Sequence, residues 1–159
     1  MPRMEAMRVA LAQELRGTGS VQLGERPDPV PAQGQVLVRV RAAGVGPWDV
    51  GFLGGGFPGV ALPFVPGQEV AGVVESAGDE AAFRPGEPVY GSLFPAGGGF
   101  AELALASAGR LAPMPEKASF DEAAALVIGA GAAHEGLLDR GRLEAGQVVL
   151  ITAAAICTA

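Results

Sequence analysis

The feature that most constrains the fold is a period-two alternation early in the chain. Between residues 36 and 42 every second side chain is a Val or an Ala, and Arg39 and Arg41 lie among the residues between them. Because successive side chains of a strand point to opposite faces, this pattern predicts a half-buried strand. Further strands are expected at 7–12, 21–26, 69–76, 88–93, 100–106 and 110–112. Many short strands separated by Gly and Pro clusters predict a small barrel or sandwich.

The pattern changes after residue 118. Ser119 and Glu122 have the spacing of a capping box, and an Ala-rich stretch follows them to about Arg140. This stretch predicts a helix, either continuous or broken near Gly129–Gly131. The apolar run Val148–Ile151 then predicts a buried strand of the kind found in parallel sheets.

Composition limits the partners of this chain. The formal net charge is −6 and no basic cluster offsets it, so neither nucleic acid nor an anionic membrane is an expected partner. Cys157 is the only cysteine, which rules out an intrachain disulfide and suits a reducing cytoplasm. No apolar run reaches the roughly 18 residues of a spanning helix, and the N-terminus has no signal-peptide pattern. We therefore expect a cytoplasmic protein whose ligand is a small molecule.

Six short strings, in order along nearly the whole chain, carry a family resemblance. They lie at 34–40, 42–49, 66–74, 98–102, 121–125 and 141–155. The most specific is Pro66-Gly67-Gln68-Glu69, which opens a Pro-Gly-x-Glu-x-x-Gly-x-Val signature. In this order the strings resemble the medium-chain dehydrogenase/reductase superfamily, in its zinc-independent, quinone-oxidoreductase-like branch.

The resemblance implies a mainly β (α+β) fold. Residues 1–124 are expected to form a GroES-like, partly open β-barrel with a few short helices, and residues 125–145 a connecting helix. Residues 146–159 are expected to begin a Rossmann-type nucleotide-binding domain that stays incomplete. Relatives continue from this point into a glycine-rich loop that lets the cofactor pyrophosphate approach a helix N-terminus, whereas residues 156–159 contain no glycine.

The resemblance also implies a function for the full-length protein. It would transfer hydride from NADPH to a quinone, an enone or a similar activated small molecule, in a cleft between two domains of a homodimeric enzyme. An alternative stays open, in which the chain is a non-catalytic GroES-like binding or assembly module. The missing glycine-rich loop favours that alternative.

The zinc ligands of metal-dependent relatives are not present at the corresponding positions. A catalytic zinc site needs three protein ligands drawn from Cys, His and acidic residues. The matching positions are Gly46, Gln68 and a residue near Gly129, and the only His and Cys, His134 and Cys157, lie at none of them. We therefore expect no metal.

The resemblance suggests Asp49 and His134 as catalytic residues. Asp49 follows the turn that carries active-site residues in relatives, and His134 is a candidate proton donor because imidazole titrates near neutrality. Each has a structural alternative: Asp49 as an acceptor for turn amides, and His134 as a hydrogen-bonded helix residue.

Further positions follow from the same comparison. The expected substrate contacts are Trp48, Gln68 and Phe52, and the expected cofactor contacts are Gly46, Ala132, Thr152 and Ala153. Trp48 has an alternative role as a rim aromatic of the barrel. Glu69 is expected to be structural, with Arg39 or Arg41 as the ion-pair partner that its burial would require.

Overall fold

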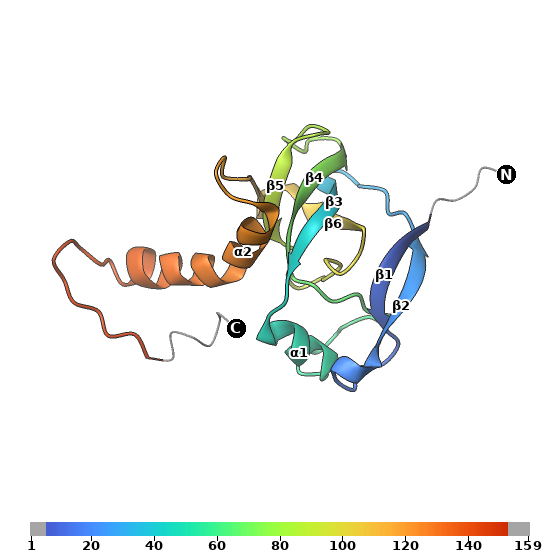
Figure 1. Cartoon of the computed structure of the whole chain (residues 1–159), viewed down its shortest axis with the longest axis horizontal. Coiled ribbons are helices and arrows are strands. Elements are labelled where there is room, and N and C mark those ends of the chain that lie inside the picture. The colour runs from blue at the N-terminus through green and yellow to red at the C-terminus, as the bar shows by residue number, and fades with distance from the viewer. Residues whose placement is uncertain (1–5, 153–159) are drawn as a thin grey trace.

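The computed structural model describes residues 6–152, which form two antiparallel sheets and a helix that projects from them (Figure 1). The strands are β1 (Ala6–Ala12), β2 (Val21–Pro27), β3 (Gln35–Gly44), β4 (Glu69–Ala77), β5 (Pro88–Ser92), β6 (Leu103–Ser107) and β7 (Leu111–Pro113). The helices are α1 (Pro47–Leu53), α2 (Phe120–His134), the 3₁₀ turns η1 (Thr18–Ser20) and η2 (Ala108–Arg110), and the π-helical turn η3 (Glu135–Arg140). The expected strands before residue 119 are therefore confirmed, although β6 begins at Leu103 and not at Phe100.

The larger sheet has the strand order β6-β3-β4-β5-β7, and β1 and β2 form the smaller sheet. Isolated bridges join β1 to the rest of the barrel, between Val9 and Ala101 and between Ala12 and Phe64. This arrangement confirms the mainly β (α+β) fold. Among the described helices, none is both long and apolar enough to cross a membrane.

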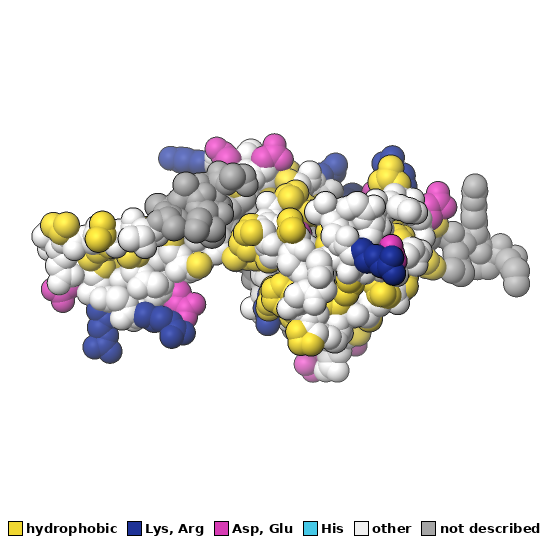
Figure 2. Space-filling view, turned by 90° about the horizontal axis from the view of Figure 1, so that it is seen from below, with side chains coloured by type: hydrophobic (Ala, Val, Ile, Leu, Met, Phe, Trp, Pro, Cys, Tyr) yellow, Lys and Arg dark blue, Asp and Glu magenta, His cyan; other side chains and the backbone are white. Residues whose placement is uncertain are grey.

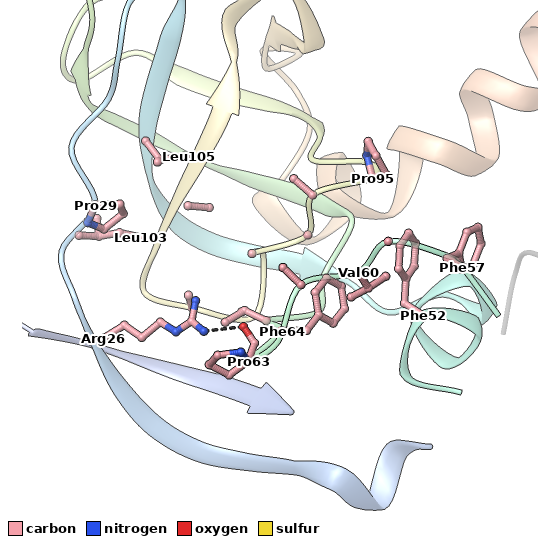
Figure 3. Close-up of a pocket in the computed structure, with 18 of the residues that line it drawn as sticks. Arg26, Pro29, Phe52, Phe57, Val60, Pro63, Phe64, Pro95, Leu103 and Leu105 are labelled. Atoms are coloured by element: carbon pink, nitrogen blue, oxygen red, sulfur yellow. Dashed lines mark hydrogen bonds between the residues drawn. The ribbon is translucent and has the colours of Figure 1, made fainter. Parts of the chain in front are cut away.

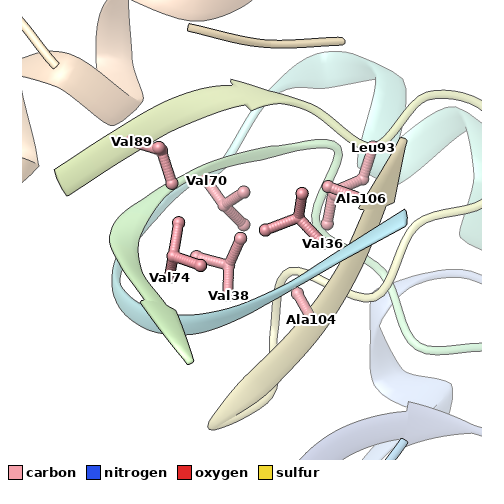
Figure 4. Packing of buried hydrophobic residues seen from close by; sticks show 8 residues of the cluster. All are labelled: Val36, Val38, Val70, Val74, Val89, Leu93, Ala104 and Ala106. Carbon is pink, nitrogen blue, oxygen red and sulfur yellow. The ribbon is translucent and has the colours of Figure 1, made fainter. Parts of the chain in front are cut away.

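The main core lies against the larger sheet and consists mostly of valines (Figure 4). Val36 and Val38 of β3 are fully buried, whereas Arg39 and Arg41 on the same strand are exposed. Burial follows the predicted alternation at these positions, but Leu37, on the same face as the arginines, is buried as well. Burying apolar side chains of this kind is worth about 25 cal/mol for each Å² removed from water.

Helix α2 begins at the predicted capping box. The Ser119 hydroxyl accepts a hydrogen bond from the Glu122 amide, and the Glu122 carboxylate accepts one from the Ser119 amide at 2.8 Å. Ala123 and Ala124 are buried in a small cluster with Ala71, so the first turns pack on the sheet. The helix continues through Gly129–Gly131 without a break and then projects away from the barrel (Figure 1).

The predicted strand at Val148–Ile151 is wrong. The segment has no regular structure, and Val148 is 97% exposed and Leu150 89% exposed. A strand is stabilised by hydrogen bonds to a neighbour, and no described strand pairs with this segment. Thr152 follows it and is also exposed, and Ala153 lies outside the described residues.

Candidate active site

Asp49 ties together two segments that meet at the end of β3 and the start of β4. It lies in the first turn of α1, where Pro47 begins the helix and Gly46 precedes it. One carboxylate oxygen accepts a hydrogen bond from the Gly46 amide at 3.0 Å, and the other accepts one from the Gly67 amide at 2.9 Å. Asp49 is only 2% exposed. The structural role that the sequence left open for this carboxylate is therefore present.

Glu69, the first residue of β4, does not pair with an arginine as the sequence suggested. Its carboxylate accepts a hydrogen bond at 2.7 Å from the backbone amide of Ile128, in the middle of α2. Arg39 instead forms an exposed ion pair with Glu75 at 2.8 Å. The prediction of an Arg39 or Arg41 partner is wrong because a backbone N–H already satisfies this buried acceptor.

Both buried carboxylates are shifted toward their protonated forms. Burial raises the pKa of Asp49 above its ordinary value, and the hydrogen bonds from Gly46 and Gly67 oppose that rise. Burial likewise raises the pKa of Glu69, the Ile128 amide lowers it, and the nearby charge of Asp49 raises it further. The two carboxylates therefore lie close enough for the charge of Asp49 to influence Glu69.

These contacts bring together the three segments that the sequence resemblance matched to the zinc-ligand positions of metal-dependent relatives. Asp49 accepts hydrogen bonds from Gly46 and from Gly67, the residue before Gln68. Glu69, the residue after Gln68, accepts one from Ile128, the residue before Gly129. The donor set does not fit a metal, because glycine offers no side-chain ligand and an amide is a poor one for zinc. Within residues 6–152 no group of three or more His, Cys, Asp or Glu side chains could hold an ion.

The same place holds polar groups that are buried without a partner. Both amide atoms of Gln68 lack a hydrogen bond, although the residue is 0% exposed, and so does the buried indole nitrogen of Trp48. In the described part of the chain, no other buried side-chain nitrogen or oxygen is left unpaired. Such groups are rare in folded proteins because each costs about 1–3 kcal/mol, so they mark a place where a ligand or water can bind.

The Trp48 ring lies over Gly46. A Cβ atom built on Gly46 would overlap indole carbons of Trp48 and lie 2.6 Å from its Nε1. The indole thus fills the volume that a side chain at position 46 would need. Gly44 is constrained in a similar way, since a Cβ there would lie 2.8 Å from a carboxylate oxygen of Glu69.

Comparisons with known proteins fit this arrangement. Residues 32–116 match the family described as "Alcohol dehydrogenase GroES-like domain". The chain belongs to this family. It is 40% identical over 125 residues to the quinone oxidoreductase of Mus musculus and 38% identical over 125 residues to that of Homo sapiens. Each match covers 77% of this chain and 38% of the relative, so the chain spans well under half the length of these two proteins.

Solved structures place the chain in the quinone-oxidoreductase-like branch of the medium-chain dehydrogenase/reductase superfamily. The quinone oxidoreductase of Coxiella burnetii matches with a TM-score of 0.84 and 27% identity, over 95% of this chain and 50% of that one. A mycobacterial protein solved in complex with NADPH matches with a TM-score of 0.75 and 32% identity, over 82% of this chain and 39% of that one.

Three other residues that the sequence associated with this family's active site lie on α2 or after it. His134 ends α2 with its side chain 64% exposed, and its Nδ1 lies 3.5 Å from a carboxylate oxygen of Asp139. Ala132, also on α2, and Thr152 are exposed. Among the described residues no hydrogen bond connects these three to Asp49, Gln68 or Trp48. Their functional roles stay predictions.

Phe52 lies in an aromatic cluster that lines one end of a cavity. It is 1% exposed and stacks on Phe57, with ring centroids 4.0 Å apart, and on Phe64 at 5.5 Å. The cavity, of about 690 Å³, runs from this cluster to β6, where Leu103 and Leu105 line it (Figure 3). Trp48 and Gln68 do not line it. Phe52 therefore belongs to an apolar hollow separate from the unpaired polar groups.

Sequence reasoning missed three contacts that build the site. It missed the hydrogen bond from Ile128 because a backbone amide leaves no mark in the residue types. It also missed the close approach of Glu69 to Gly44 and the position of the Trp48 ring over Gly46. The signal in the sequence was glycine at positions 44 and 46, which leaves room for the Glu69 carboxylate and the Trp48 indole.

Proposed function

We propose that the full-length protein is a zinc-independent, NADPH-dependent reductase of the quinone oxidoreductase type, acting on a quinone, an enone or a similar activated small molecule. The proposal rests mainly on the side chains of the three segments around Gly46, Gln68 and Gly129, which Asp49 and Glu69 connect. They offer no metal ligand at Gly46, Gln68 or Gly129, yet they retain buried, unpaired hydrogen-bonding groups. The identity with quinone oxidoreductases and the NADPH complex of a structural neighbour support it.

Hydride from a bound nicotinamide would go to a carbon that conjugation has already made electrophilic, so the oxygen needs stabilisation but no metal. The chain's part is to orient the substrate, exclude water and donate hydrogen bonds to the oxygen as negative charge develops there. Trp48 and Gln68 are the donors available for this task.

The test uses the protein of the complete reading frame. We expect it to oxidise NADPH in the presence of a quinone or an enone, measured by loss of NADPH absorbance, with the same rate after dialysis against a zinc chelator. Loss of activity on chelation and recovery with zinc would contradict the metal-free mechanism. No NADPH binding and no turnover with either substrate class would favour the binding or assembly module.

A matched control is the 159-residue chain itself. We expect these residues alone to transfer no hydride, because the sequence contains no glycine-rich loop for the cofactor pyrophosphate. NADPH oxidation by this chain with a common quinone would show that the cofactor binds in some other way.

A further inference from the structure

We propose that the cavity beside β2 is a second ligand site, which binds a free monocarboxylate with an apolar tail through Arg26. The cavity has a volume of about 690 Å³ and is lined by residues of β2, of the segment 57–65 and of β6. Asp49, Trp48 and Gln68 do not line it. The inference therefore concerns a different place from the candidate active site, and it holds whether or not the protein is a reductase.

The first argument is the charge of the lining. Among the described residues that line the cavity, Arg26 alone carries a charge, and all the others except Gln35 are apolar side chains or glycines. The side-chain oxygen of Gln35 already accepts a hydrogen bond from the Ala32 amide at 3.0 Å. A charged group of a ligand would thus meet one cation and no anion in the cavity, which selects a negative charge.

The second argument is that Arg26 has donors to spare. Its side chain is partly buried and donates one hydrogen bond, to the carbonyl oxygen of Pro63 (Figure 3). No other hydrogen bond or ion pair joins the guanidinium to a residue in the range 6–152. A guanidinium has five N–H donors in a planar fork that matches the two oxygens of a carboxylate. The bond to Pro63 also limits the orientations of the group, so less freedom is lost when a ligand binds.

The third argument concerns the rest of the ligand. From the Arg26 end, where Leu103 and Leu105 also lie, the cavity leads to Phe52 and Phe57 at the other end (Figure 3). Its volume is within the range of about 300–1,000 Å³ that is common for small-molecule sites. An apolar tail would fit along this wall. A nucleotide or a phosphate ester would lack the second cation that a dianion requires.

The position of the cavity keeps its charged end accessible. Strand β2 lies on the side of the barrel away from α2 (Figure 1). A ligand can therefore reach Arg26 without crossing the face on which α2 packs. Because the carboxylate would pair beside apolar walls and not on an open surface, the ion pair would be screened less by water than an exposed one.

The first experiment compares two ligands that differ only in the head group. The dissociation constants of octanoate and 1-octanol are measured by isothermal titration calorimetry, with the protein of the complete reading frame and no cofactor. We expect octanoate to bind more tightly, on the order of 10-fold, because a charge-assisted pair replaces a neutral contact. Equal affinities for the two compounds, or no binding of either, would overturn the proposal.

Substitution of Arg26 assigns this preference to one side chain. Arg26→Gln should weaken octanoate binding to the level of 1-octanol and leave 1-octanol binding unchanged. Arg41→Gln is the matched control, because Arg41 is exposed on β3 and does not line the cavity. Equal losses in the two variants would show an effect of net charge alone. Loss of both ligands in Arg26→Gln would show that Arg26 only shapes the cavity through Pro63. Either result contradicts recognition of the carboxylate.

The second experiment tests the apolar tail. In the series hexanoate, octanoate and decanoate, each added CH₂ group should lower the dissociation constant about fourfold if it is buried. Leu105→Trp should weaken binding by filling the cavity, whereas Leu23→Trp, at a 90% exposed position that does not line it, should not. Affinities of the wild type that do not depend on chain length would refute the inference, whatever the fold of the Leu105→Trp variant.

Discussion

Single residues hold the candidate site together through backbone amides. Asp49 accepts two of them, from Gly46 and Gly67, and Glu69 accepts one from Ile128. None of these bonds involves a positively charged partner, so the carboxylates are stabilised by aligned N–H groups while burial opposes their charge. The site therefore depends on the precise placement of a few peptide groups.

Replacing Asp49 by Ala leaves two backbone amides without an acceptor. Each unpaired buried N–H costs about 1–3 kcal/mol, so we expect the free energy of unfolding to fall by about 2–4 kcal/mol. Urea unfolding followed by circular dichroism measures the change. Asp79→Ala, an exposed position, is the control, and equal effects of the two substitutions would contradict the role of Asp49.

Glu69 makes stability depend on pH in a defined direction. Its pKa is raised in the folded chain, so the folded state holds the proton more tightly than the unfolded state and is favoured at low pH. This contribution is lost as the pH rises through the raised pKa. Gln keeps an acceptor for the Ile128 amide and cannot ionise. In Glu69→Gln the unfolding free energy should therefore fall less as the pH rises.

Comparing the unfolding free energy of the wild type with that of Glu69→Gln isolates the contribution of Glu69. Exposed carboxylates such as Glu75 and Glu102, whose pKa values their arginine partners lower, act in the opposite direction and are common to both. Unfolding free energies measured from acid to neutral pH should therefore converge at low pH and separate as the pH rises, with Glu69→Gln the more stable at neutral pH. Parallel curves would refute this assignment.

A further residue-scale prediction concerns Gly46. Gly46→Asn should destabilise the chain, because the new side chain competes with the Trp48 indole for one volume. In a Trp48→Ala background the same substitution should cost much less, which a double-mutant cycle of unfolding free energies measures. Additive effects would show that the two residues do not compete.

Residue types predicted part of this site. Asp49 after a Gly-Pro turn is an expected acceptor for turn amides, and that role is present. The partner of Glu69 was out of reach, since Ile128 lies 59 positions away and contributes only its backbone. The ring position of Trp48 depends on side-chain packing that no local pattern encodes.

At the scale of elements, the period of the apolar residues and the capping residues were sufficient to predict the strands before residue 119 and the start of α2. The strands follow from period-two alternation and Gly/Pro turns, and α2 begins at Ser119 as the capping box requires. Val148–Ile151 shows the limit of the method. Its residues favour a strand, but a strand forms only with a neighbour, and the neighbour is a property of the whole fold.

Glycines in α2 provide an element-scale prediction. Gly131 lies in the helix, and a Cβ built there meets nothing within 4 Å. Gly131→Ala should therefore stabilise the chain by about 0.5–1 kcal/mol and increase helical circular dichroism. Gly72→Ala is the contrast, because its Cβ would meet the carbonyl oxygen of Arg39, and it should destabilise. A destabilising Gly131→Ala would indicate that the helix is strained at this point.

At the scale of the whole molecule, the segment that projects from the barrel carries exposed apolar side chains along its length. Figure 2 shows hydrophobic side chains on the surface of that projection. Leu126, Leu138, Val148 and Leu150 are 45%, 48%, 97% and 89% exposed. Apolar surface of this kind tends to be covered by another domain or another chain.

We therefore expect the 159-residue chain to self-associate. Sedimentation velocity should show species larger than a monomer whose fraction rises with protein concentration. A Val148→Lys/Leu150→Lys double variant should shift the distribution toward the monomer, whereas Gln22→Lys, on the barrel, should not. A wild-type chain that stays monomeric at all concentrations would refute the expectation.

The Trp48 ring over Gly46 also restricts how homologous sequences can diverge. A lineage that gains a side chain at position 46 must move or replace the tryptophan at 48, because the two would otherwise overlap. Homologues with Asn or Cys at the first position should lack an indole at the second, and those that keep the indole should keep glycine before it.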